Sequence, residues 1–599
     1  MSDDYRSAWR PVERNPAPEH AAEIVGVACR MRQTERMNPT ENLRAARDIL
    51  IEHRDDAAAA EAAFAWPDVG EYFNWAVDWF DAVAVGNEKT ALWIVEEDGR
   101  ETKVSFDWMR WRSDEVAAWL AAEGVEQGDH VMLMLGNRVE LWESMLAIMK
   151  LGAVILPTTT LLSPADLADR LERGRVGHVI VDAADTAKFE GLDGEFTRIV
   201  VGASEGEPAE GWLDYDESLE GIGISPTVVV RSDDPCLIYF TSGTTSKPKM
   251  VVHTHASYPV GHLSTSYWLG LRPGDVHLAI SSPGWGKHAW SCFFAPWNAE
   301  ATVFVTNYVR FEPVALLRRL DEARVSTFCA PPTVWRMLIQ AELGKKPRAL
   351  REALSAGEPL NPGVIAAVQE AWGLTIRDGY GQTETTALIA NPPGGSVVPG
   401  AMGRALPGVA IAIIDPVSGS PATTGEICLD LSVEPVNLMA GYLSDDERTA
   451  AARAGGYFHT GDVAERADDG TITFIGRTDD IFKSSDYKIS PFEVESVLLR
   501  HPAVAESAVV PAPDATRHTV VKAYVALAEG WAADASTARE IFEHSRTELS
   551  AFERVRRIEF FELPKTISGK IRRVELRERE QEAFDRGEEI ASEWRGDRL

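Results

Sequence analysis

The stretch Tyr239-Phe-Thr-Ser-Gly-Thr-Thr-Ser-Lys-Pro-Lys249 decides how the rest of this sequence is interpreted. The apolar runs Cys236–Phe240 and Met250–His253 flank it, so the pattern predicts a loop between two strands. Gly243 lets backbone N–H groups approach a ligand, and hydroxyl and ammonium groups gather in the same loop. This composition is typical of a nest for a polyanion such as a nucleoside triphosphate, with a polar surface hairpin as the alternative. It is not a Walker A loop, because no Gly-Lys-Ser/Thr follows at the required spacing.

Further motifs accompany this loop, and together they resemble the adenylate-forming, or AMP-binding, superfamily of acyl- and aryl-CoA synthetases, luciferases and adenylation domains. They are Ser355-Ala-Gly-Glu-Pro359, Asp378-Gly-Tyr-Gly-Gln-Thr-Glu384, Tyr457-Phe-His-Thr-Gly-Asp462, Gly476-Arg-Thr-Asp-Asp480 and Pro564-Lys-Thr-Ile-Ser-Gly-Lys570. The motifs stand in the family's order across more than half of the chain. The segment Trp285-Gly-Lys-His-Ala-Trp290 is most similar to the medium-chain acyl-CoA synthetases. Ser246 departs from the family, which usually has glycine there.

The length and the periodicity predict an α/β protein of more than one domain. A chain of 599 residues exceeds a single core, and helical and strand patterns alternate from about residue 107 onward. The resemblance implies a large N-terminal domain of parallel and mixed sheets with flanking helices, and a small mobile α+β C-terminal lid. We place the large domain at 37–478, the lid at 479–599 and the hinge at Asp479. Residues 1–36 are polar and contain prolines, so we expect a disordered extension.

The resemblance also implies the ATP site. Glu384 is expected to hold Mg²⁺ with the ATP phosphates, since Mg²⁺ prefers oxygen ligands. Thr241, Glu384 and Lys570 are the expected catalytic residues, with Lys570 acting on the α-phosphate. The other expected ATP contacts are Ser242, Gly243, Thr244, Thr245, Lys249, Gly357, Glu358, Pro359, Asp378, Gly379, Tyr380, Gln382, Thr383, Asp462, Arg477 and Lys488.

The acid and CoA sites are implied in the same way. Trp285, Gly286 and Gly381 are expected in the acyl pocket, with Trp290 beside Trp285 as a second apolar wall. Acetyl-CoA synthetases as a group have tryptophan where this chain has Gly381, so the glycine predicts a deeper cavity that small acids fill poorly. Ser484, Ser485 and Asp486 are expected on the CoA side. Many relatives have glycine at position 486, so Asp486 is a departure.

The amino-acid composition argues against several classes of binding partner. The net charge of −32 argues against a nucleic-acid binder, and the sequence contains no apolar run long enough to predict membrane insertion. The five cysteines are scattered and lack metal-binding spacing, which predicts a reduced, cytoplasmic chain. The expected partners are a small carboxylic acid, ATP and CoA, and a homodimer is left open.

We therefore expect an AMP-forming acyl-CoA synthetase, an acid–thiol ligase. It would join a medium-chain, branched or aromatic carboxylic acid to AMP and then transfer the acyl group to CoA. Two alternatives remain at this point. One is an adenylating enzyme that loads a carrier protein, and the other is a catalytically silent nucleotide-binding protein.

Overall fold

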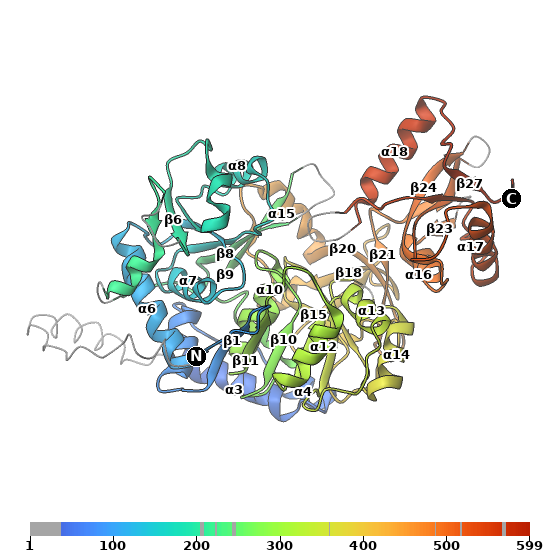
Figure 1. Cartoon of the computed structure of the whole chain (residues 1–599). Coiled ribbons are helices and arrows are strands. Elements are labelled where there is room, and N and C mark those ends of the chain that lie inside the picture. Colours follow the sequence, from blue (N-terminus) through green and yellow to red (C-terminus); the bar gives the residue numbers. More distant parts are fainter. Residues whose placement is uncertain are drawn as a thin grey trace, which may run out of the picture.

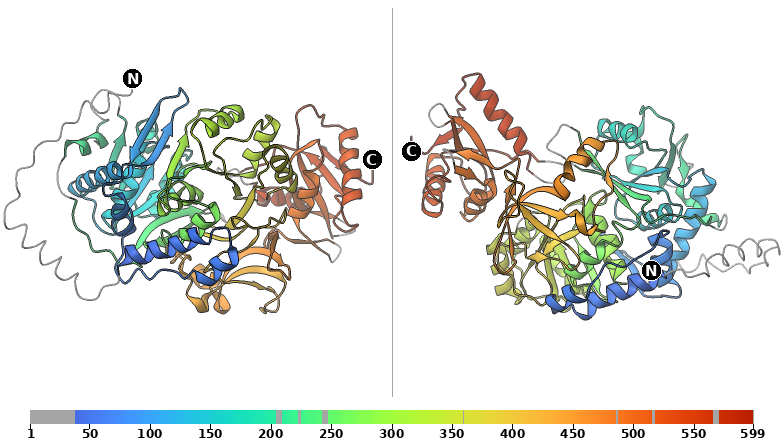
Figure 2. Two further views of the ribbon diagram at one scale, coloured as in Figure 1. Left: turned by 90° about the horizontal axis from the view of Figure 1, so that it is seen from below. Right: turned by 180° about the vertical axis from the view of Figure 1, so that it is seen from behind.

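The computed structural model describes residues 38–203, 209–221, 225–241, 247–358, 360–484, 487–514, 518–565 and 571–598. A large body carries a smaller C-terminal unit at one end (Figures 1 and 2). The expected N-terminal extension, residues 1–36, lies outside the described residues.

The first sheet of the large body is mostly parallel. Its strand order is β16-β15-β14-β13-β12-β10-β11-β1-β2, with antiparallel pairs at both edges. The strands are β1 (Thr90–Val95), β2 (Glu101–Ser105), β10 (Val276–Ala279), β11 (Thr302–Thr306), β12 (Thr327–Ala330), β13 (Glu352–Ala356), β14 (Arg377–Gly381), β15 (Ala387–Ala390) and β16 (Arg404–Ala405).

The second sheet contains the strands that flank the opening stretch. Its order is β19-β9-β8-β4-β3-β5-β6-β7, parallel from β8 through β7 and antiparallel from β8 to β9 and on to β19. The strands are β3 (His130–Met134), β4 (Val154–Pro157), β5 (His178–Asp182), β6 (Thr197–Val201), β7 (Leu213–Asp214), β8 (Pro235–Thr241), β9 (Lys249–Thr254) and β19 (Gly441–Tyr442).

Helices lie between and outside these sheets. Those of the large body are α3 (Pro39–Glu52), α4 (Ala57–Ala63), η1 (Trp75–Asp81), α5 (Ala82–Ala84), α6 (Phe106–Ala122), α7 (Val139–Lys150), α8 (Pro164–Arg173), η2 (Ala183–Phe189), η3 (Tyr215–Glu220), α9 (His262–Leu269), α10 (Gly286–Ala289), η4 (Trp290–Phe294), α11 (Ala295–Asn298), α12 (Pro313–Glu322), α13 (Pro332–Gln340), α14 (Pro362–Trp372), η5 (Leu431–Val433), α15 (Asp446–Ala452) and η6 (Ala454–Gly456).

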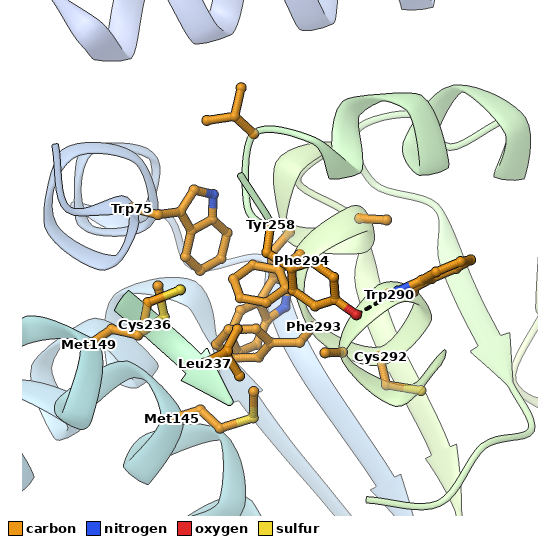
Figure 3. Close-up of a cluster of buried hydrophobic side chains, with 14 of the residues drawn as sticks. Trp75, Met145, Met149, Cys236, Leu237, Tyr258, Trp290, Cys292, Phe293 and Phe294 are labelled. Carbon is orange, nitrogen blue, oxygen red and sulfur yellow. Dashed lines mark hydrogen bonds between the residues drawn. The ribbon is translucent and has the colours of Figure 1, made fainter. Parts of the chain in front are cut away.

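The layer between the two sheets is the main core. Helices α9, η4 and α11 contact the first sheet, while α7 contacts β3 and β4 of the second. Trp142 of α7 donates its indole N–H to the carbonyl of Cys292 in η4 over 2.7 Å, which joins the two sides. Figure 3 shows the aromatic and sulfur side chains packed there. Burial of this apolar surface fixes how the two sheets face each other.

A third, antiparallel sheet leads into the C-terminal unit. It has the order β17-β18-β20-β21, formed by β17 (Ile411–Ile414), β18 (Thr424–Asp430), β20 (Tyr457–Arg466) and β21 (Ile472–Arg477). The C-terminal unit contains β22 (Phe482–Ser484), β23 (Tyr487–Ile489), β24 (Val504–Asp514), β25 (His518–Leu527), β26 (Arg557–Phe560) and β27 (Glu593–Arg595), with α16 (Pro491–Leu498), α17 (Ala535–Glu548) and α18 (Arg573–Asp585). This arrangement confirms the expected α/β class with a smaller C-terminal domain.

Candidate active site

The opening stretch joins adjacent antiparallel strands, as the sequence predicts. Thr241 at the end of β8 lies opposite Lys249 at the start of β9. Ser242, Gly243, Thr244 and Thr245 lie outside the described residues, and so do Pro359, Ser485, Asp486 and Lys570. The two strands that flank the loop therefore bring its ends side by side.

Lys249, at the start of β9, lies close to Glu384. Lys249 Nζ lies 4.0 Å from Glu384 Oε1 and 5.2 Å from the centre of the Tyr442 ring. Tyr442 donates its hydroxyl to the same carboxylate oxygen over 3.0 Å. Burial lowers the pKa of Lys249, while Glu384 opposes that shift. A half-buried carboxylate and a lysine thus lie next to each other, a combination suited to a metal-bound phosphate chain.

Two glycine-containing motifs meet because β13 and β14 are parallel neighbours. Ser355 pairs with Asp378, and Ala356 pairs with Gly379. Gly357 follows directly after β13, with φ of 106°, which favours glycine. A Cβ atom at Gly379 would lie 2.4 Å from the Trp268 ring, so that site also requires glycine. The expected ATP contacts in these motifs therefore share one end of the first sheet.

Asp378 is a buried carboxyl group within this region. Its Oδ1 accepts the N–H of Gly379 over 3.1 Å. Burial raises the pKa of Asp378 from 3.8 to about 8, although backbone N–H groups and Lys287 partly offset the effect. The side chain is therefore mainly protonated at neutral pH. A protonated carboxyl can donate as well as accept a hydrogen bond.

Asp462 is hydrogen-bonded to several other residues that are predicted to contact the nucleotide. Its Oδ2 accepts hydrogen bonds from the Tyr380 hydroxyl and from Gln382 Nε2, each over 2.6 Å. Its Oδ1 lies 3.2 Å from Arg477 Nη1, because Asp462 and Arg477 are opposite each other on β20 and β21. The carboxylate is only 6% exposed, so its orientation is fixed by these donors.

The sequence analysis did not predict the residues that support the turn containing Asp462. Glu426 Oε1 accepts the N–H of Gly461, beside Asp462, over 2.8 Å. Glu426, Cys428 and His459 also place potential metal-ligand atoms within 4.8 Å of one another. His459 Nδ1, however, already contacts Glu426 Oε2 at 2.8 Å, and its Nε2 contacts the Ala454 carbonyl. These contacts explain the cluster as support for the Asp462 turn.

Two of the glycines expected in the acyl pocket have close neighbours. A Cβ atom at Gly286 would lie 3.3 Å from both Thr383 Oγ1 and the Tyr258 hydroxyl. The space on the Cβ side of Gly381 is filled, while the deeper acyl cavity expected there stays a prediction. A Cβ atom there would lie 2.2 Å from the Thr386 carbonyl oxygen and 2.6 Å from Trp290 Cη2. Sequence reasoning could not foresee this, since the chain spacing does not show which tryptophan faces the glycine.

Comparison with known proteins identifies the family of this chain. A model of the AMP-binding enzyme family matches residues 79–443, and a model of its C-terminal domain matches residues 493–570. The chain belongs to the AMP-binding enzyme family. It is 40% identical over 525 residues to 4-hydroxybutyrate--CoA ligase 1 of Metallosphaera sedula, covering 86% of this chain and 92% of that protein. It is 37% identical over 536 residues to mouse acyl-coenzyme A synthetase ACSM3, mitochondrial, covering 86% and 91%.

Solved structures of AMP-binding enzymes agree in fold. The anthranilate CoA ligase AuaEII in complex with anthranoyl-AMP has a TM-score of 0.77 and 28% identity, covering 86% of this chain and 99% of its own. A benzoate CoA ligase from Burkholderia xenovorans LB400 has a TM-score of 0.72 and 27% identity, covering 84% and 100%. The family resemblance found in the motifs is thereby confirmed.

The chain turns at the predicted hinge residue, Asp479, between β21 and β22. Asp480 N donates to the Arg477 carbonyl, which makes a turn around Asp479, and Asp479 Oδ1 accepts from Arg477 Nε over 3.0 Å. Beyond this turn Asp480 pairs with Arg577 at 2.6 Å. Lys488 is exposed on β23. The role of Asp479 as a hinge stays a prediction.

Ser484, expected on the CoA side, is buried, and its hydroxyl donates to the Thr519 carbonyl over 3.0 Å within the C-terminal unit. Its place on the CoA side stays a prediction. Among the described residues, no helix is both long and apolar enough to cross a bilayer.

Arg573 connects the C-terminal unit electrostatically to the ATP motifs. Burial lowers the pKa of Arg573, but Glu495, Asp480 and Glu358 raise it by more, so the net shift is upward. Glu495 and Asp480 lie in the C-terminal unit, whereas Glu358 follows β13 of the large body. The start of α18 is therefore close enough to the ATP motifs for their charges to interact.

Proposed function

We propose that this protein is an AMP-forming acyl-CoA synthetase. A carboxylate oxygen of the acid attacks the α-phosphorus of ATP, and the bond to the bridging oxygen breaks to release pyrophosphate. The CoA thiolate then attacks the acyl carbon of the acyl-AMP, and AMP leaves. The main support is the pair of clusters at the strand ends, Asp462 with Tyr380 and Glu384 with Lys249. The first suits a ribose and the second suits a phosphate chain.

The residue roles follow from this geometry. Asp462 has a fixed carboxylate that can accept ribose hydroxyls, and Arg477 holds it in place. Thr383 and Thr241 supply hydroxyls near the α-phosphate. Lys570 supplies a positive charge where negative charge develops, and preorganised charges of this kind dominate such catalysis.

Mg²⁺ fits the Glu384 site. Tyr442 donates to Oε1 of Glu384, and among the described residues no protein donor contacts Oε2. A carboxylate oxygen is the kind of hard ligand that Mg²⁺ requires. When bound, the ion would neutralise phosphate charge. Glu384 would hold it, and Tyr442 would orient the carboxylate.

A single site must serve two reactions, so we also propose domain rotation. The large domain, 37–478, keeps the nucleotide, and the lid, 479–599, turns about Asp479. In one orientation the lid presents Lys570, and in the other it presents the expected CoA contacts. Lys488 meets phosphate in one of these orientations. The charge interaction between Arg573 and Glu358 supports contact between the two units.

The acid is bound between Trp285, Gly286 and Gly381. We propose a medium-chain, branched or aromatic acid, and acids of the size of 4-hydroxybutyrate, which a 40% identical relative is named for, belong in the same screen. We further propose a cytoplasmic location, supported by the unpaired buried thiols of Cys236, Cys292, Cys329 and Cys428. The oligomeric state, for which a homodimer is one possibility, is to be measured on the purified protein.

The test separates the proposed function from its alternatives. Purified protein is mixed with Mg·ATP and a panel of acids, and pyrophosphate and AMP are measured with CoA, with a carrier protein or with neither. AMP release that depends on CoA supports the proposal. Release that depends on the carrier supports a carrier-loading enzyme. If no acid yields pyrophosphate, the protein is not an adenylating enzyme.

A further inference from the structure

A cavity of about 520 Å³ lies beside the predicted phosphate site. Lys249 lines it, and so does Tyr442, the residue that donates to Glu384. The rest of the lining comes from the end of α8 and from the segment that joins β19 to α15, which lie next to each other although they are far apart in the sequence (Figures 1 and 2). The cavity therefore begins at an expected ATP contact and extends beyond the residues that are expected to bind ATP.

The lining carries an excess of positive charge. Its cations are Arg173, Arg175, Lys247, Lys249 and Arg448, against the two carboxylates of Glu172 and Asp445. The whole chain has a net charge of −32, so this cluster has the opposite sign to the rest of the protein. A cavity lined by one sign of charge attracts ligands of the other sign.

Arg175 and Ser444 contact each other from the two segments that meet here. Arg175 Nη2 lies 3.4 Å from Ser444 Oγ. Both residues have left-handed backbone, with φ of 49° and 57°, a conformation that only glycine adopts routinely. Strained residues of this kind gather at binding sites. Among the described residues Arg175 pairs with no carboxylate, so its guanidinium is available to an anion.

Arg448 brings a second guanidinium close to Lys249. Its Nε pairs with Asp445 at 3.0 Å. Burial lowers the pKa of Lys249, Glu384 opposes this shift, and the charge of Arg448 adds to it. The two cations therefore repel each other, and a bound polyanion would relieve the repulsion. Neither Arg175 nor Arg448 is an expected ATP contact, so ATP binding alone does not account for them.

We propose that this cavity is a binding site for pyrophosphate. The inference rests on the proposed function and deepens it, because pyrophosphate is released next to Lys249 in the first half-reaction. Its several negative charges can meet more than one of the cations at once. Arg175 and Arg448 hold the anion after it has left the nucleotide, and the retained pyrophosphate inhibits adenylate formation.

The first test measures binding without catalysis. Sodium pyrophosphate is titrated by calorimetry into wild type, Arg175→Gln and Arg448→Gln, with no ATP, acid or CoA present. We expect each substitution to raise the Kd for pyrophosphate by about tenfold, the scale of one hydrogen bond to a charged group. Arg318→Gln, on the exposed face of α12, is the matched control and should bind as wild type does. Wild-type affinity in both cavity variants overturns the inference.

The second test is kinetic. Pyrophosphate should inhibit the forward reaction about tenfold more weakly in Arg175→Gln and Arg448→Gln, while the KM for ATP changes far less. A substitution that only loosened the fold would change both constants together, which overturns the inference. Arg448→Lys keeps the charge and should restore part of the inhibition.

Two further outcomes would overturn the assignment to pyrophosphate. One is sulfate or orthophosphate that binds as tightly, since the cavity would then attract any anion. The other is a KM for CoA that rises in the variants while that for dephospho-CoA does not, because the cavity would then hold the 3′-phosphate of CoA. Wild-type protein that forms no AMP from any acid would instead refute the proposed function, which the calorimetric test does not require.

Discussion

The hydroxyl of Tyr380 donates a hydrogen bond to Asp462 Oδ2 over 2.6 Å, joining two motifs that are 82 residues apart in the chain. Gln382 donates to the same oxygen, and Arg477 approaches the other. Three donors therefore hold one carboxylate before any nucleotide binds. A group fixed in this way loses little conformational entropy on binding a ribose.

Asp462→Ala should weaken ATP use. The substitution removes the acceptor for the ribose hydroxyls, and one hydrogen bond to a charged acceptor is worth about 1.5–3 kcal/mol. It also leaves Arg477 with Asp479 as its carboxylate partner. We expect kcat/KM for ATP to fall by at least about 10–10²-fold, the loss of one such bond. Initial rates of pyrophosphate release at varied ATP measure the effect.

Asp469→Ala is the matched control for this prediction. The Asp469 side chain is 57% exposed and pairs with Arg404 on the surface. Exposed pairs of this kind contribute little to stability. We expect ATP use to be unchanged in this variant. If both substitutions have the same small effect, Asp462 does not bind the ribose.

Glu384→Gln should change the response to Mg²⁺. The amide removes the charge that we expect to hold the ion, so half-maximal activity should require a several-fold higher Mg²⁺ concentration. Tyr442→Phe removes the hydroxyl that orients Glu384 and should shift the Mg²⁺ dependence in the same direction but less. The exposed Glu447→Gln serves as the control. An Mg²⁺ titration that is identical for Glu384→Gln and wild type would contradict the metal role.

Local sequence patterns account for several strands and helices of the large domain. The two strands that flank the opening stretch, β8 and β9, follow from its apolar runs. Ser163 accepts the N–H of Asp166 and completes a capping box at the start of α8, a local signal that the sequence carries. Helix α6 starts at Phe106 because Ser105 accepts the N–H of Trp108 and caps it.

Contacts between distant segments were harder to foresee. The Gly381 position could be aligned with relatives, but the filling of its space by Trp290 depends on how η4 packs against β14. Similarly, nothing in the chain spacing shows that Tyr442 orients Glu384, or that the Ser484 hydroxyl turns toward Thr519. Local propensity does not contain these tertiary relations.

Asp378 should make stability depend on pH. Burial raises its pKa from 3.8 to about 8, so the folded protein keeps a proton that the unfolded chain releases near pH 4. The folded state then binds more protons than the unfolded state between about pH 4 and pH 8, and the free energy of unfolding falls as pH rises through this window. Asp378→Asn does not titrate, so its melting temperature should fall less between pH 5 and pH 8.5.

The comparison is made by thermal unfolding across that pH range. The exposed Asp468→Asn changes one carboxylate on the surface and should retain the wild-type slope. Parallel curves for wild type and Asp378→Asn would show that the Asp378 carboxyl is ionised in the folded protein throughout the window.

Lys570→Ala should separate the two half-reactions. Adenylate formation places extra negative charge on the α-phosphate, and loss of one electrostatic donor there typically costs about 10²–10³ in rate. Arg573, which follows shortly after, already interacts with Glu358 beside the ATP motifs. Thioester formation needs the other lid orientation, so the variant should still convert supplied acyl-AMP and CoA at near the wild-type rate. Lys570→Arg should restore adenylation only in part, because the rigid guanidinium fork differs from a compact ammonium group.

Lys565→Ala is the control for Lys570, since it removes a lysine from the same motif. Its ammonium group pairs with Glu506 at 2.7 Å within the C-terminal unit, and its side chain is 41% exposed. We expect both half-reactions to proceed in this variant. Pyrophosphate release measures adenylation, and acyl-CoA formed from synthetic acyl-AMP measures the second step. A folded Lys570→Ala that adenylates normally, or that has lost both steps equally, would refute the assigned role, because a lysine carried by a rotating lid must affect one step far more than the other.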